Sequence, residues 1–167
     1  FMEITDLGSQ SFFDHIKDKK NKLIDYKKLV DVILKLQKIK LKRFYYFEKN
    51  KIKFVKYSLS QLHKESDLFF DWYLKFTVKN KNLKKIKKIL RLELNNIYKK
   101  LYFKNEYFIH RDFHASNIML NNKKLGVIDS QDAIIGNPLY DVVSLIDDVR
   151  IKLPHNLRNS LFKYYIH

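Results

Sequence analysis

Residues Phe108–Asn117 read Phe-Ile-His-Arg-Asp-Phe-His-Ala-Ser-Asn, and we expect the rest of the fold to be organised around this segment. Two short apolar runs follow it, Ile118–Leu120 and Leu125–Ile128, and the polar residues 121–124 between them predict a β-hairpin. Asp129 closes the second run. Because the strands of a hairpin run in opposite directions, Asp129 should return to the edge at which Phe108–Asn117 enters.

Three side chains of this region have the chemistry of phosphoryl transfer, which needs a group that orients the acceptor hydroxyl and ligands that hold a metal ion against the phosphates. Asp112 can accept the proton of an attacking hydroxyl. Asn117, five places later, and Asp129 offer hard oxygen ligands that suit Mg²⁺. A lone Asp or Asn is far more often a turn former or a cap, but the joint spacing favours the functional interpretation.

The neighbouring polar residues are expected to support the segment Phe108–Asn117, which we call the loop. His110 is interpreted as a structural brace that acts through hydrogen bonds rather than as a general base. Arg111 could brace the loop electrostatically or contact phosphate. His114 could face the acceptor or only fill the loop, and the sequence leaves both alternatives open.

The composition is that of a folded protein: 46% of the 167 residues are hydrophobic and 15% are aromatic, enough to form a core. The length fits one domain or a piece of a larger one. No apolar run approaches the roughly 20 residues that span a bilayer, and the first residues lack a signal-peptide pattern. The absence of cysteine excludes disulfides, so we expect a protein of the reducing cytoplasm.

The formal charge of +16 raises the question of a nucleic-acid partner. Lys far outnumbers Arg, while Asn, Ile, Phe and Tyr are abundant, which is the bias of an A/T-rich coding sequence. Specific nucleic-acid recognition relies on Arg for bidentate contacts. We therefore do not expect nucleic acid to be the partner, although the charge should attract anions in a salt-dependent way.

Apolar periodicity predicts that most of the remaining chain is helical. A helix capped by Ser9 or Ser11 should carry Phe12, Phe13 and Ile16. Further helices are predicted at 23–39, from Ser58 until an interruption at Asn80–Asn82, at 83–101, and from Pro138 to Pro154, with a last helix near the C-terminus. The apolar residues of the helix at 23–39 are Tyr26, Leu29, Val30, Ile33 and Leu36. Those of the helix at 83–101 form one buried stripe: Leu83, Ile86, Leu90, Leu94, Ile97 and Leu101.

The motifs together resemble the aminoglycoside phosphotransferase/choline kinase-like superfamily. The resemblance lies in His110–Asn117, in Gly126–Ala133 and in Gly136–Leu145. Within that superfamily the Ile-Asp-x-Gln-Asp-Ala and Tyr-Asp-x-x-Ser-Leu runs are most similar to bacterial kinases that phosphorylate N-acetylmuramate and N-acetylglucosamine at the anomeric hydroxyl. Leu68–Leu74 resembles their helical segment that approaches the acceptor.

The resemblance implies a role for each candidate residue, with ATP and Mg²⁺ as cofactors. Asp112 would be the catalytic base, and Asn117 and Asp129 would bind Mg²⁺. Asp141 would brace the loop together with His110 and Arg111. The acceptor side would include Glu65, Asp71, Trp72, His114 and Asp132, and the backbone of Glu3 and Thr5 would contact adenine.

The fold implied is α+β, the mainly helical C-terminal lobe of a protein-kinase-like fold with a small hairpin that carries the catalytic residues. Residues 1–167 would form a single domain that begins at the hinge, residues 1–8. None of the three glycines forms a phosphate loop, and the first residue is Phe, so we expect a fragment that lacks the N-terminal nucleotide lobe. Ser130 replaces the large apolar residue usual after the metal-binding Asp.

The expected activity is phosphoryl transfer from ATP to a small-molecule hydroxyl, with an amino sugar such as N-acetylmuramate, from cell-wall recycling, as the favoured acceptor. A truncated or degenerate lobe without catalysis is an alternative. Aminoglycoside, choline and homoserine kinases share the same loop, so these acceptors also stay open. A basic RNA-binding helical protein is the least favoured alternative, and the sequence does not determine the oligomeric state.

Overall fold

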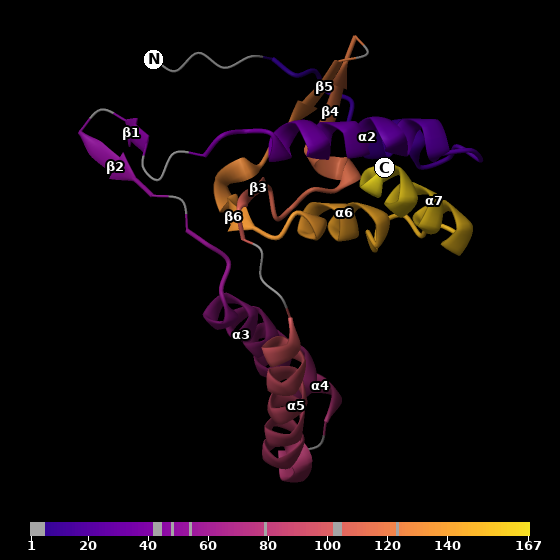
Figure 1. Cartoon of the computed structure of the whole chain (residues 1–167). Helices are drawn as coiled ribbons and strands as arrows, with labels where there is room; N and C mark the ends of the chain where they lie inside the picture. The colour runs from indigo at the N-terminus through magenta and orange to yellow at the C-terminus, as the bar shows by residue number, and fades with distance from the viewer. Residues whose placement is uncertain are drawn as a thin grey trace. The chain divides into compact units, whose positions relative to one another are not determined.

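The computed structural model describes residues 6–41, 45–47, 49–53, 55–78, 80–101, 105–122 and 124–167. The expected hinge contacts of Glu3 and Thr5 lie outside these residues. The chain forms two compact units, which we describe separately (Figure 1). Unit 1 contains Phe1–Val55 and Asn105–His167, and unit 2 contains Lys56–Lys104.

Helices α1, α2, α6 and α7 form the body of unit 1. Helix α1 (Phe12–Ile16) starts at Ser11, whose hydroxyl accepts a hydrogen bond from a backbone N–H of the first turn. Helix α2 (Leu23–Gln37) confirms the amphipathic helix predicted from periodicity.

The prediction that the helix beginning at Pro138 ends at Pro154 was wrong. Helix α6 (Leu139–Ile146) begins after Pro138 as expected, but it stops well before Pro154. Pro154 instead precedes the first residue of α7 (His155–Ile166). A proline lacks the backbone N–H that a helix start leaves unpaired, so it fits there without loss.

Three two-stranded antiparallel sheets occur among the described residues. Strands β4 (Ile118–Asn121) and β5 (Lys124–Val127) confirm the predicted hairpin. Strands β3 (Tyr107–Ile109) and β6 (Ile134–Gly136) pair with each other. The third sheet pairs β1 (Tyr45–Phe47) with β2 (Asn50–Ile52). The second and third sheets were not predicted, because three-residue strands give too short a pattern to recognise.

The core of unit 1 lies between its helices and the hairpin. Helix α2 packs against α7, α6 and β3, and α1 packs against β4. Figure 1 shows α2, α6 and α7 side by side below the β4–β5 hairpin. The fully buried side chains of this core include Phe12, Ile16, Tyr26, Leu29, Val30, Ile33, Phe113, Ala115, Ile118, Val142, Leu145 and Leu161. The segment that follows β3 therefore enters the centre of the packed unit.

Unit 2 consists of α3 (Leu59–Leu68), the π-helical segment η1 (Phe69–Tyr73), α4 (Leu74–Thr77) and α5 (Asn80–Lys100). Ser58 caps α3 as predicted, since its hydroxyl accepts the backbone N–H of Gln61. Asn80–Asn82 does not interrupt a helix but begins α5. The break lies earlier, at Val78, whose backbone is extended.

The buried stripe of α5 also differs from the prediction at its C-terminal end. Leu83, Ile86, Leu90 and Leu94 are half-buried as expected. Ile97 and Leu101 are 53% and 45% exposed, whereas Tyr98 is buried. Tyr98 follows Leu94 by four residues and stays on the inner face of the helix. Ile97 follows Leu94 by only three residues and turns to the outer face.

The fold class expected from the sequence is confirmed at the level of a mainly helical α+β protein with small antiparallel sheets. No helix in the described parts of the chain is long and apolar enough to cross a membrane.

Candidate active site

Strand β3 leads the candidate catalytic segment into the core of unit 1. Its last residue, Ile109, is fully buried and faces Ile134 of β6. Gly136 lets the two strands approach, because a Cβ added there would lie 2.2 Å from Cδ1 of Ile109. His110 follows and is also buried, and its Nε2 donates to the carbonyl of Ile128 over 2.9 Å. This bond joins the start of the loop to the end of β5.

Asp141, in the first turn of α6, holds the backbone of the loop. One carboxylate oxygen accepts the N–H of His110 over 2.8 Å and the other accepts the N–H of Arg111 over 3.0 Å. Arg111 has a φ of 72°, a left-handed conformation that a non-glycine residue seldom adopts. Burial raises the pKa of the Asp141 carboxyl, while the two hydrogen bonds lower it. The carboxylate thus stabilises a turn that would otherwise be unfavourable.

Asp112 and Asn117 are fixed to each other by the loop. The side-chain NH₂ of Asn117 donates to the backbone carbonyl of Asp112 over 3.0 Å. That bond turns the amide oxygen of Asn117, the atom that could bind a metal ion, away from the Asp112 carbonyl. The side chain of Asp112 is exposed, whereas Asn117 is half-buried at the end of the short 3₁₀ turn η2 (Ala115–Asn117).

The register of the β4–β5 hairpin brings Asp129 to the end of the hairpin at which Asn117 lies. Ile118 pairs with Val127, and the N–H of Ile128 donates to the carbonyl of Asn117 over 3.0 Å. Asp129 is the next residue and is exposed, with φ 66° and ψ 42°. Asp129 therefore directly follows the residue whose N–H is bonded to Asn117. The role of Asn117 and Asp129 as metal ligands stays a prediction.

The residues after Asp129 form the short 3₁₀ turn η3 (Ser130–Asp132). Ser130 and Asp132 are both exposed. The carbonyl of Ser130 accepts the N–H of Ala133 and closes this turn. The side chain at position 130 therefore lies at the surface.

His114 lies under the loop and is only 8% exposed. Its Nε2 stands 3.6 Å from Oδ1 of Asp112. Burial and the nearby Arg150 guanidinium lower the pKa of His114, against the opposing effect of the Asp112 and Asp148 carboxylates. Burial therefore favours the neutral imidazole, and its Nε2 is turned toward Asp112.

The donor set fits Mg²⁺ bound together with a nucleotide. In the part of the chain that the structure describes, no three His, Cys, Asp or Glu side chains gather into a closed metal site. Asn117 and Asp129 supply one amide oxygen and one carboxylate. Mg²⁺ commonly takes one or two protein oxygens and completes its shell with phosphate oxygens and water.

Three residues expected on the acceptor side belong to unit 2. Glu65 accepts a hydrogen bond from the Tyr57 hydroxyl. Asp71 forms a 2.6 Å ion pair with Lys87, and this pair lowers the pKa of its carboxyl. Trp72 is 67% exposed. Their role toward an acceptor stays a prediction.

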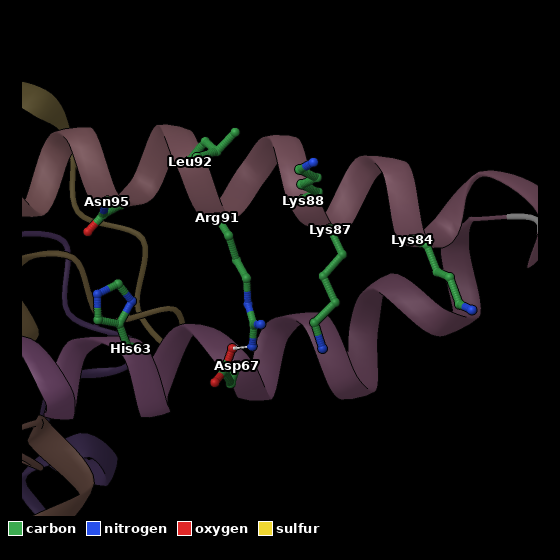
Figure 2. A pocket seen from close by; sticks show the side chains of 8 residues that line it. All are labelled: His63, Asp67, Lys84, Lys87, Lys88, Arg91, Leu92 and Asn95. Atoms are coloured by element: carbon green, nitrogen blue, oxygen red, sulfur yellow. Dashed lines mark hydrogen bonds and ion pairs between the residues drawn. The ribbon is translucent and has the colours of Figure 1, made fainter.

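Unit 2 also contains an open groove of about 740 Å³ between α3 and α5 (Figure 2). Figure 2 shows Arg91 of α5 pointing across to Asp67 of α3, with which it forms an ion pair. Lys87 points the same way, and its ammonium is bound to Asp71. Because carboxylates of this unit already pair with these two cations, we interpret the groove as a helix-to-helix seam bridged by ion pairs.

Sequence analysis missed two charged residues, Asp148 and Arg150, that act electrostatically on His114. Asp148 is buried although it follows α6 in a turn, and Arg150 donates to one of its carboxylate oxygens. Tyr26 appeared only as an apolar member of α2, yet its hydroxyl is buried as well. No motif spacing connects these positions, because they come from separate segments that only the fold brings together.

Comparison with known proteins identifies the class. The profile of the phosphotransferase enzyme family matches residues 16–166, and the chain belongs to this family. The resemblance read from the sequence motifs, to aminoglycoside phosphotransferases, is thereby confirmed.

Its curated relatives include three N-acetylmuramate/N-acetylglucosamine kinases. The one from Pseudomonas aeruginosa is 27% identical over 170 residues, which cover 99% of this chain and 46% of that protein. Those from Neisseria meningitidis serogroup B and Pseudomonas putida are 29% and 25% identical, covering 58% and 92% of this chain and 29% and 42% of the relatives. The chain therefore spans less than half the length of the curated relatives it matches.

Among solved structures, the streptomycin–ATP–APH(2")-IIa ternary complex matches with 21% identity and a TM-score of 0.36. The match covers 89% of this chain and 70% of that one.

Proposed function

We propose that this chain carries the catalytic loop of a kinase that transfers the γ-phosphoryl group of ATP to a hydroxyl of a small molecule. The observation that supports the proposal is the pair of hydrogen bonds that joins the backbone of Asp112 to Asn117 and the backbone of Asn117 to Ile128, the residue before Asp129. In this family the arrangement goes with ATP and Mg²⁺ as cofactors.

In the proposed reaction, Asp112 orients the acceptor hydroxyl and takes its proton. The acceptor oxygen forms a bond to the γ-phosphorus while the bond from that phosphorus to the β–γ bridging oxygen breaks, and ADP leaves. Asn117 and Asp129 would hold Mg²⁺, which neutralises charge on the phosphates. Positioning and charge neutralisation carry the catalysis, without a covalent enzyme intermediate.

We propose an amino sugar, N-acetylmuramate or N-acetylglucosamine, as the acceptor. The support comes from the three curated relatives, whose names give both sugars, and from the Ile-Asp-x-Gln-Asp-Ala and Tyr-Asp-x-x-Ser-Leu runs at 128–133 and 140–145.

The test measures phosphoryl transfer by the complete product of the gene, with ATP, Mg²⁺ and a panel of amino sugars, aminoglycosides, choline and homoserine. We expect turnover with the amino sugars and a loss of about 100-fold or more in Asp112→Ala and in Asp129→Ala. Asp147→Ala is the matched control, since Asp147 is an exposed acid of unit 1 paired with Arg158. Full activity in either loop variant would refute the proposal, and turnover of another acceptor would correct the substrate.

A further inference from the structure

The groove of unit 2 between α3 and α5 is lined by more cations than carboxylates. Its volume of about 740 Å³ lies in the range of small-molecule sites in proteins. The charged residues of its lining, apart from histidine, are Lys84, Lys87, Lys88, Arg91 and Asp67. Four cations therefore face a single carboxylate within the lining itself.

Two of these four cations are neutralised by acids of the helical segment opposite α5. Arg91 forms an ion pair with Asp67 of α3. The ammonium of Lys87 lies 2.6 Å from a carboxylate oxygen of Asp71, in η1. These two pairs bridge the groove and leave the other two cations to be explained.

The remaining cations, Lys84 and Lys88, have no hydrogen-bond or ion-pair partner among the residues that the structure describes. Unit 2 has only two more acids, Glu65 and Glu93. Glu65 accepts a hydrogen bond from the Tyr57 hydroxyl, and the groove lining includes neither acid. Two positive charges of the groove are thus left without compensation.

The spacing of the cations along α5 adds mutual repulsion. Lys84, Lys87 and Arg91 follow one another by three and four residues, so they share one face of the helix. Figure 2 shows all three extending from α5 toward the opposite helical segment. Lys88 follows Lys84 by four residues. Like charges at these spacings destabilise a helix, and an anion in the groove would relieve their repulsion.

We propose that this groove binds a phosphate group, either free or as a monoester. Such a group carries close to two negative charges near neutral pH, which match the two uncompensated cations. It also has three strong acceptor oxygens. His63 and Asn95 line the same groove and can donate side-chain N–H groups to these oxygens. The proposal concerns unit 2 alone and does not depend on phosphoryl transfer by unit 1.

NMR of the full chain without ATP or Mg²⁺ tests the proposal, so that turnover plays no part. The ring signals of His63, assigned with His63→Gln, and the amides of α3 and α5 are followed at pH 7.5 and constant ionic strength. The probes are inorganic phosphate, glucose 6-phosphate and glucose. We expect saturable shifts with both phosphates and none with glucose.

The affinities of the two phosphates distinguish the sources of the ligand. Tighter binding of glucose 6-phosphate would identify a monoester as the occupant, and equal binding would identify the phosphate group alone. The lack of a saturable shift with either phosphate would overturn the proposal.

A pair of double variants separates a defined site from the general charge of the unit. Lys84→Gln combined with Lys88→Gln removes both uncompensated charges and should weaken phosphate binding about 10-fold. Lys99→Gln combined with Lys100→Gln is the matched control, because these lysines are exposed in the last turn of α5 and lie outside the groove lining. Equal weakening in the two double variants would refute the site.

Asp67→Asn should change the affinity in the opposite direction. It removes the single acid of the lining and frees Arg91, so phosphate should bind about 3-fold more tightly. Circular dichroism checks that the variant is folded. Unchanged or weaker binding in the folded variant would contradict the proposal. If the variant does not fold, the two double variants still decide.

Discussion

The two units of this chain hold their polar groups in opposite ways. In unit 1, the loop backbone at His110 and Arg111 is bound by a carboxylate that is 1% exposed. In unit 2, the acidic residues Asp67 and Asp71 form exposed ion pairs with α5. Buried hydrogen bonds with a charged partner fix geometry far more strongly than exposed ion pairs. The comparison indicates that unit 1 is built for fixed positions and unit 2 tolerates adjustment.

The apolar residues of the two units differ in their burial. Unit 1 encloses a continuous core around α2 and the hairpin. In unit 2, the segment from α3 to α4 exposes a row of large side chains: Leu68, Phe69, Trp72, Tyr73 and Phe76 are 45–85% exposed. A row of exposed aromatic side chains is typical of surfaces that contact ligands or other protein surfaces.

The largest effect on stability is expected at Asp141. In Asp141→Asn, one of the two buried backbone N–H groups loses its acceptor, and the variant should lose about 2–3 kcal/mol of unfolding free energy. Chemical denaturation followed by circular dichroism measures the loss, and amide hydrogen exchange should quicken at His110 and Arg111. Asp147→Asn, an exposed neighbour, should change stability by less than about 0.5 kcal/mol. Equal effects in the two variants would contradict the difference between buried and exposed acids.

A smaller and pH-dependent effect is expected at Asp25. Burial raises the pKa of its carboxyl, but the hydrogen bonds and charges of Lys19 at 2.8 Å and Lys28 at 3.4 Å outweigh burial and leave that pKa below its usual value. As the pH falls, the Asp25 carboxyl therefore takes up its proton in the unfolded chain before it does so in the folded chain. The stabilisation of the fold by the Asp25 ion pairs is present above about pH 4 and is lost below it. Asp25→Asn should cost about 1–2 kcal/mol at pH 7.

The measurement for Asp25 is the difference in unfolding free energy between wild type and variant from pH 7 to pH 3. The difference should shrink below about pH 4, and Asp18→Asn, which alters an exposed acid nearby, should show little difference throughout. A difference in unfolding free energy that stays constant down to pH 3 would mean that the ion pairs do not stabilise the native state.

The smallest effect is expected in unit 2. Arg91→Gln breaks the exposed ion pair with Asp67 and should cost at most about 0.5–1 kcal/mol, diminishing as salt is added. Trp72 is the single tryptophan of the chain and lies in this unit, so its fluorescence follows the unfolding there. Lys88→Gln, a change in the same groove, is the control. A loss above 2 kcal/mol would show that unit 2 also depends on fixed polar contacts.

Local sequence patterns predicted much of the fold because their physical causes are local. Capping by Ser11 and Ser58, the apolar period of α2 and the β4–β5 hairpin all depend on neighbouring residues. The helix break at Val78 was missed by two residues, and the end of α6 at Ile146 lies a full two turns before the predicted end at Pro154. A helix end also depends on packing, which local patterns do not record.

The sequence by itself determined the family and the candidate residues Asp112, Asn117 and Asp129, since their types and spacing are a property of the chain alone. Only the tertiary structure decided which distant groups support them. It placed the carboxylate of Asp141 against the loop backbone, paired β3 with β6, and buried Asp148. The reason is physical: contacts between segments far apart in sequence follow from how the helices pack, and no local spacing records them.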